Sequence, residues 1–127
     1  MFTREIIEQQ SLIEFYKNNG MLEEYYKREI ENAWNYKTLD KIYSKEIWQG
    51  EHRINHCQAW FIEYGNFKIV KSYNTIVAVY CKDIDVLFSI GRFSNTTYQH
   101  IRKFRNNYLP NTYRTKEINL ELVNWYR

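Results

Sequence analysis

The sequence predicts an α+β fold, in which N-terminal helices pack on an antiparallel sheet of four to five strands and a basic helix follows the sheet. Apolar residues recur every three or four positions up to about residue 50, and from residue 51 they follow strand-like patterns separated by short turns. A helical period returns once, after Gly91. No linker, repeat or low-complexity segment divides the 127 residues. We therefore expect one domain, 1–127, with a helical part (1–50) and a sheet plus helix (51–127).

Three helices are expected in the N-terminal part. The first begins with Thr3 as its N-cap and ends at Gly20, a residue type that stops helices. The second runs from Met21 to about Trp34, and the third covers residues 38–48 before Gly50 ends it. The apolar positions that should face the core are Ile6, Ile7, Ile13, Tyr16, Leu22, Tyr25, Tyr26, Ile30, Ala33, Trp34, Leu39, Ile42, Tyr43 and Ile47.

Four strands are expected between residues 52 and 90. The segment 52–64 is rich in β-forming residues, and Gly65-Asn66 after it is typical of a tight turn. The alternating segment 67–72 completes a hairpin, and the runs 75–82 and 86–90 follow through short polar turns. Such short loops cannot span a parallel crossover, so these strands should be antiparallel.

A last helix and a last strand complete the expected fold. Ser94 or Asn95 can cap a helix that ends before Pro110, and the alternation from Ile118 to Leu122 predicts a fifth strand. The helix carries its apolar residues at spacings of three and four, namely Tyr98, Ile101, Phe104 and Tyr108. Packing all helices on one face of the sheet is the simplest arrangement.

Composition restricts the location of the protein and the chemistry of its thiols. The longest apolar run, 75–81, is far shorter than the roughly 20 residues that span a membrane. The charged N-terminus, with Arg4 and Glu5, lacks the apolar core of a signal peptide, so a cytoplasmic protein is expected. In that compartment Cys57 and Cys81 should be free thiols.

No motif in the chain indicates catalysis or a cofactor. His52 and His56 are four residues apart, but the other possible zinc ligands are scattered and lack a recognised spacing. Cys57 and Cys81 each neighbour a basic residue, yet adjacent strand residues point to opposite faces, so buried structural thiols are favoured. We therefore expect no enzyme activity, no metal site and no cofactor.

Charge is distributed unevenly along the chain. Residues 1–65 have a net charge of −3 and residues 66–127 of +6, and no acidic residue lies between Asp85 and Glu117. That acid-free block contains Arg92, Arg102, Lys103 and Arg105, and it indicates contact with a polyanion or an acidic protein surface. The basic residues of the helix predicted before Pro110 are also typical of the solvent-exposed face of a helix whose other face packs on the core.

A central segment resembles proteins from mobile genetic elements. The run SYNTIVA (72–78), followed by GRFSNTT (91–97), His100, Ile101 and Phe104, resembles small proteins of unassigned function from phages and plasmids of low-GC bacteria. The match covers about a quarter of the chain and implies no catalytic role. By size and origin the chain also resembles phage anti-CRISPR proteins, which act by occluding a surface of a Cas nuclease.

This resemblance implies an inhibitor of a host defence nuclease or its guide complex, most plausibly Cas9, that acts in the host cytoplasm. Two surfaces of the protein could bind the nuclease or its guide complex. An acidic one could mimic nucleic-acid phosphates, and the basic helix could bind an acidic surface or the guide RNA. The acidic residues are Glu23, Glu24, Glu29 and Glu31. The alternative is a small nucleic-acid-binding regulator that uses Arg102, Lys103 and Arg105.

Overall fold

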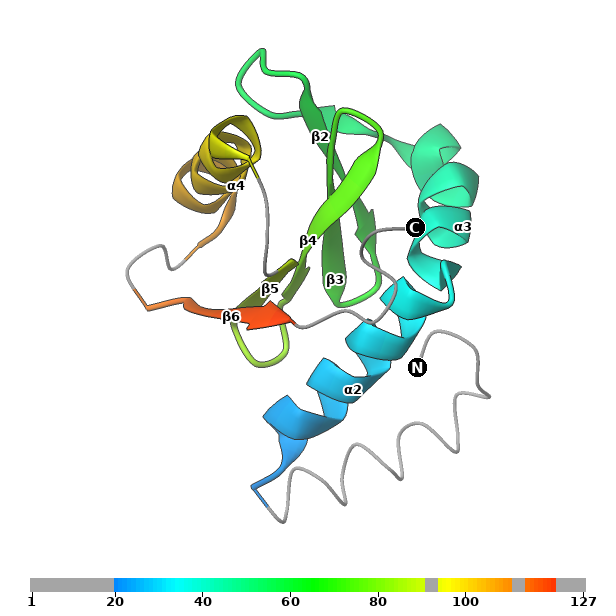
Figure 1. Cartoon of the computed structure of the whole chain (residues 1–127), viewed down its shortest axis with the longest axis vertical. Helices are drawn as coiled ribbons and strands as arrows, with labels where there is room; N and C mark the ends of the chain where they lie inside the picture. The colour runs from blue at the N-terminus through cyan, green and yellow to red at the C-terminus, as the bar shows by residue number, and fades with distance from the viewer. Residues whose placement is uncertain (1–19, 91–93, 111–113, 121–127) are drawn as a thin grey trace.

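A computed structural model describes residues 20–90, 94–110 and 114–120, in which a sheet lies between helices (Figure 1). The expected helices at 21–34 and 38–48 are confirmed as α2 (Leu22–Asn35) and α3 (Thr38–Glu46), the latter extended by the 3-10 helix η1 (Ile47–Gln49). The helix expected to begin at Thr3 lies outside the described residues. Among the described residues, no helix is long and apolar enough to cross a membrane.

The strands of the sheet follow one another in chain order. The antiparallel strands predicted after residue 58 are confirmed, and each pairs with the next through a short turn. The bounds are β1 (His52–Arg53), β2 (Ala59–Tyr64), β3 (Phe67–Ser72), β4 (Thr75–Cys81), β5 (Val86–Ile90) and β6 (Lys116–Leu120). The segment 52–64 is not one strand, because Asn55 and His56 adopt positive φ angles of 40° and 62° and separate β1 from β2.

The prediction of an antiparallel sheet with four to five strands is wrong in two respects. The described residues form six strands, and β6 pairs with β5 in parallel, with Phe88 opposite Ile118. The cause is α4 (Asn95–Tyr108), which lies between these strands in the chain. A helical crossover returns the chain to the end of the sheet at which β5 began, so that the next strand runs in the same direction.

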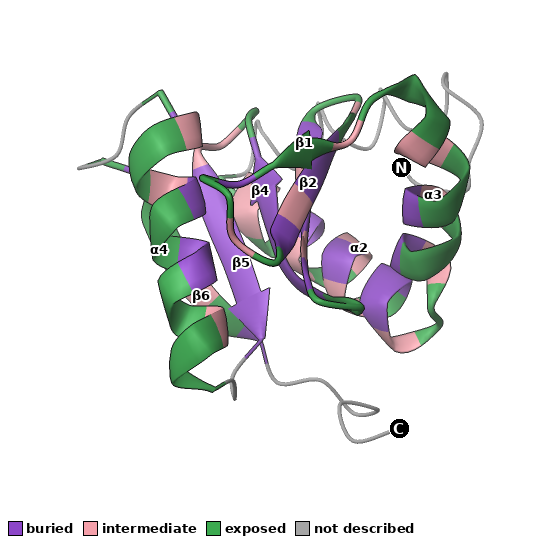
Figure 2. Cartoon of the chain, turned by 90° about the horizontal axis from the view of Figure 1, so that it is seen from above, coloured by how far each residue is buried: buried purple, intermediate pink, exposed green. Residues whose placement is uncertain are grey.

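The prediction that all helices pack on one face of the sheet is also wrong. Phe61 of β2 meets Phe104 of α4, with ring centroids 5.2 Å apart, whereas Phe67 of β3 meets Tyr26 of α2 at 5.9 Å. Phe61 pairs with Val70, three residues from Phe67, so these two rings point to opposite faces. Figure 2 shows α4 on one side of the strands and α2 with α3 on the other.

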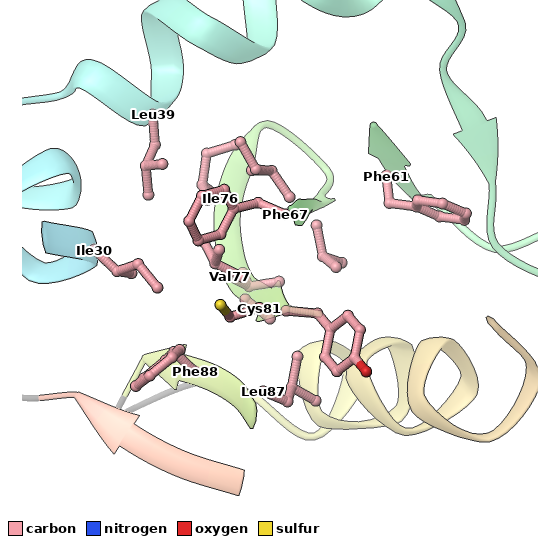
Figure 3. Packing of buried hydrophobic residues seen from close by; sticks show 14 of the residues in the cluster. Ile30, Leu39, Phe61, Phe67, Ile76, Val77, Cys81, Leu87 and Phe88 are labelled. Carbon is pink, nitrogen blue, oxygen red and sulfur yellow. The ribbon is translucent and has the colours of Figure 1, made fainter. Parts of the chain in front are cut away.

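The core extends over both faces of the central strands. All of β5 and every residue of β4 after Thr75 are buried, as is typical of strands that are covered on both sides. Figure 3 shows Ile30 and Leu39 pointing from the helical layer toward Phe67 and Ile76 of the sheet. The burial of these side chains is the main stabilising contribution to the fold.

A half-buried cation attaches α3 to the sheet. The Nζ atom of Lys71 lies 4.7 Å from the ring centre of Tyr43 and 5.4 Å from that of Trp60, and it pairs with Glu51 at 3.4 Å. The hydroxyl of Tyr43 donates to the same carboxylate at 2.6 Å. Burial and this hydrogen bond raise the pKa of Tyr43, so its hydroxyl stays protonated. Lys71 thus serves a structural role on this face.

Candidate functional site

Helix α4 carries the main functional candidates, and its first turn is fixed by a serine cap. Ser94 has an extended backbone, with φ −70° and ψ 165°, and its Oγ accepts a hydrogen bond of 3.2 Å from the backbone N–H of Thr97. This satisfies one of the N–H groups that a helix start leaves open. Of the two caps considered from the sequence, the structure selects Ser94.

The inner side of α4 is anchored by a buried polar contact as well as by apolar packing. Ser72 Oγ at the end of β3 and His100 Nδ1 are 2.7 Å apart, and the two residues are 3% and 5% exposed. Burial, and then the charge of Lys103, lower the pKa of His100, so the imidazole is neutral at neutral pH. Ile101 and Phe104 fill the adjacent core. The helix is therefore held firmly enough to present its outer side to a ligand.

The predicted basic residues of α4 divide into two groups. Arg102 and Lys103 are exposed, and neither has a carboxylate partner among the described residues. Arg105 instead bonds Glu117 at 2.9 Å and the carbonyl of Thr115 at 2.6 Å, which ties α4 to β6. Arg92 lies outside the described residues. Two of the four predicted cations therefore remain available for a partner.

The end of β1, together with the turn that follows it, places a further cation, Arg53, beside α4. The Tyr108 hydroxyl accepts a hydrogen bond of 3.2 Å from the backbone N–H of Asn55, which holds this turn against the helix. Cys57 then contacts two cations, because Lys103 Nζ lies 3.2 Å from its Sγ and Arg53 Nε donates to its carbonyl at 2.9 Å. Arg53 is not among the residues predicted from the sequence, since no local pattern shows that residues 53–57 fold against a helix some 50 positions later.

We define the α4 surface as five exposed side chains on the outer side of α4 and at the end of β1. Figure 2 shows the outer side of α4 as a largely exposed surface. Arginine and lysine can pair with phosphate oxygens there, and the amides can donate and accept hydrogen bonds. Its members are Arg53, Gln99, Arg102, Lys103 and Asn106.

The predicted acidic residues of α2 form a less accessible group. Glu23 pairs with Lys116 of β6 at 3.0 Å, and Glu29 and Glu31 are only half-exposed, whereas Glu24 is exposed. Lys27 and Arg28 lie on the same helix between these acids. The structure therefore does not bring the four glutamates together as a continuous negative surface.

A recess of about 680 Å³ opens where α4 ends against β3 and β4. Its charged groups already have partners: Lys68 donates to the carbonyl of Tyr108 at 2.9 Å, and Lys82 pairs with Glu63 at 3.1 Å. Asp85 accepts from Tyr80 at 2.7 Å, and burial together with this bond raises the pKa of the Tyr80 hydroxyl. The recess thus offers less unpaired positive charge than the α4 surface.

The groups considered for metal binding and for thiol chemistry are not assembled into a site. His52 and His56 are both exposed, and His52 stacks on Phe61 with ring centroids 4.9 Å apart. Within residues 20–90, 94–110 and 114–120, no three His, Cys, Asp or Glu side chains are placed to hold a metal ion. Cys57 and Cys81 are both free thiols, and burial raises the pKa of Cys81 to about 12.

Comparison with known proteins places the chain in a family without assigning a reaction. A family model described as "Family of unknown function (DUF8033)" matches residues 8–120. No curated protein and no solved structure matches the chain. Because the family model covers most of the sequence, the chain belongs to this family of unknown function.

Proposed function

We propose that the protein binds nucleic acid through the α4 surface. The observation that carries this proposal is the placement of Arg102 and Lys103 on the outer side of α4, exposed and without a carboxylate partner in the described part of the chain. Arg53 lies next to them, because it and Lys103 both contact Cys57. Exposed cations of this kind supply most of the affinity of proteins for phosphate backbones.

The distribution of acids also supports the proposal. Arg105 pairs with Glu117 at 2.9 Å, the first acidic residue after Asp85 in the chain, so the negative charge nearest to α4 in sequence is already compensated. The helix itself carries no acid. A polyanion that approaches the α4 surface therefore meets cations and neutral amides rather than repelling carboxylates.

The test is a fluorescence-anisotropy titration of labelled DNA and RNA at low salt. The double variant Arg102→Ala/Lys103→Ala should weaken binding at least tenfold, and the matched variant Arg28→Ala/Lys45→Ala, which removes the same two residue types from α2 and α3, should not. Circular dichroism checks that both variants fold. Absence of binding by the unmodified protein at low salt, or equal losses in the two variants, would overturn the proposal.

A second candidate function is occlusion of a host defence nuclease such as Cas9, as the phage-type resemblance implies. The observation that favours it is Trp48 of η1, whose side chain is 89% exposed, with Tyr36 exposed at the C-terminal end of α2. Large exposed aromatic residues are typical energetic centres of protein interfaces. Such an interface could cover a nuclease surface without contacting nucleic acid.

This candidate is tested in a DNA-cleavage assay with the loaded nuclease. Excess protein should reduce cleavage, and Trp48→Ala should restore it while leaving nucleic-acid binding unchanged. Asn32→Ala, which changes an exposed residue of α2, serves as the control. Full cleavage in the presence of excess unmodified protein would exclude this function for the nuclease tested.

A further inference from the structure

The outermost line of α4 consists of polar side chains only. Asn95, Gln99, Arg102 and Asn106 follow at intervals of four, three and four residues, and all four are exposed. Since each helical residue turns by about 100°, these four side chains lie within about 60° of one another around the axis. They form a narrow row opposite the buried Ile101 and Phe104. We call this row the α4 row.

The α4 row has the composition that reads base edges in duplex DNA. Asparagine and glutamine pair bidentately with adenine, and arginine pairs bidentately with guanine. Within the part of the chain that the structure describes, the side chains of Asn95, Gln99 and Asn106 make no hydrogen bond to another residue. Arg102 lies over the ring of Tyr98, 5.8 Å from its centre, which keeps the guanidinium along the same side of the helix. The row is therefore free to bond to a ligand.

The setting of α4 suits the major groove. Its 14 residues extend over about 21 Å, and a helix about 10–12 Å wide fits a groove about 12 Å wide. Among the described elements, α4 stands by itself on its face of the sheet (Figure 2). The Ser72–His100 contact and the burial of Phe104 fix its rotation, which keeps the row directed outward. Lys103 lies beside the row, where a phosphate strand that borders the groove would pass.

We infer that α4 is a recognition helix that reads base edges in the major groove of B-form DNA, so that the protein prefers particular duplex sequences. This inference rests on the proposed nucleic-acid binding and names its ligand class. RNA duplexes are excluded because their major groove is too deep and narrow for a helix. Single strands are excluded because they lack a groove with regularly spaced base-pair edges to which the α4 row could form hydrogen bonds.

The decisive experiment is selection of bound duplexes from a randomised DNA library, followed by titration of the selected and an unrelated duplex. A sequence preference should emerge. Gln99→Ala and Asn106→Ala should each reduce the preference for the selected duplex by about 5- to 150-fold. Binding to the unrelated duplex should fall much less, because the cations supply most of the non-specific affinity. Lys103→Ala should weaken both duplexes equally, because phosphate contacts carry no sequence information. Asn32→Ala on α2 should change neither.

The outcomes separate this inference from the function on which it rests. Salt-sensitive binding with no selected sequence, or with equal affinity for single strands and RNA duplexes, overturns the recognition helix and leaves nucleic-acid binding intact. A preference that survives in both amide variants also overturns it. Absence of binding to every nucleic acid at low salt overturns both proposals.

Discussion

Ser72 at the end of β3 and His100 in the middle of α4 share a buried hydrogen bond of 2.7 Å between Oγ and Nδ1. The contact joins the sheet to the helix that carries the candidate ligand surface. Tyr73 places its ring 5.7 Å from the His100 ring and covers the pair from the β3–β4 turn. The position of α4 thus depends on a polar contact as well as on apolar packing.

Replacement of Ser72 should therefore destabilise the protein. Ser72→Ala leaves a buried imidazole nitrogen without its partner, which costs about 1–3 kcal/mol in the free energy of unfolding. Urea denaturation measures this change. Ser44→Ala, at an exposed position of α3, is the control and should stay within about 0.5 kcal/mol of the unmodified protein. Equal stability of the two variants would show that the Ser72–His100 bond contributes nothing.

The lowered pKa of His100 predicts that stability decreases in mild acid. Below about pH 6.5 the unfolded chain takes up a proton on this histidine more readily than the folded chain, because burial opposes the charge. The stability that depends on neutral His100 is fully present above that pH. It is lost as the pH falls toward the lower pKa of His100 in the folded state. Unfolding measured at about pH 7.5 and about pH 5.5 should show this decrease, and His100→Gln should show less of it. An unchanged pH dependence in the variant contradicts the assignment.

Asp85 should be a second stabilising polar centre. Its Oδ1 accepts hydrogen bonds of 2.7 Å from both Tyr80 and Thr115, which connects the β4–β5 turn to the start of β6. Asp85→Ala should cost at least about 1.5 kcal/mol, because two hydroxyl groups lose a charged acceptor. Thermal unfolding measures this loss. Asp40→Ala, at an exposed position of α3, is the control, and a similar effect of the two changes would show that the Asp85 contacts are unimportant.

The two thiols should differ strongly in reactivity. Cys81 is fully buried and burial raises its pKa to about 12, whereas Cys57 is half-exposed beside Lys103. Since the thiolate is the reactive form, a thiol reagent should label Cys57 in the folded protein and Cys81 only after unfolding. Mass spectrometry of the labelled protein with and without denaturant measures this. Rapid labelling of Cys81 in the folded state would contradict its burial.

The salt dependence of nucleic-acid binding should distinguish the cations of α4. Lys103→Ala should reduce the slope of log affinity against log salt by about 1, because it removes one phosphate contact. Arg105→Ala should leave the slope unchanged, since Arg105 pairs with Glu117, and should lower stability instead. Titrations at several salt concentrations check this. A slope that changes with Arg105 but not with Lys103 would mean that the binding surface is centred on β6.

Local sequence patterns predicted the helices and turns well, whereas the wrong predictions concern contacts between residues far apart in the chain. The spacing in α2 and the turn at Gly65-Asn66 are properties of neighbouring residues, and both were confirmed. The parallel pairing of β6 depends on how α4 returns the chain, which no local pattern specifies. One signal was available: Val86–Ile90 is apolar almost throughout, and such strands are typical of a sheet covered on both faces.

The candidate site could be predicted only in part, for a related reason. The acid-free block indicated α4, but charge alone could not show that Arg105 faces Glu117 while Arg102 faces solvent. The helical period contains that distinction, since Arg102 lies opposite the buried side and Arg105 beside it. The approach of Arg53 to Lys103 requires the fold of the turn after β1, so residue spacing could not reveal it.

The chain order of the strands has a consequence for how the molecule assembles. Strands β1 to β5 pair with their neighbours across short turns, so their loops close at little entropic cost, whereas the β5–β6 pair closes only after the chain has crossed through α4. We therefore expect the hairpins to form early and α4 with β6 to dock last. The helix that carries the candidate ligand surface then belongs to the final folding step, and a ligand bound there would slow the first step of unfolding.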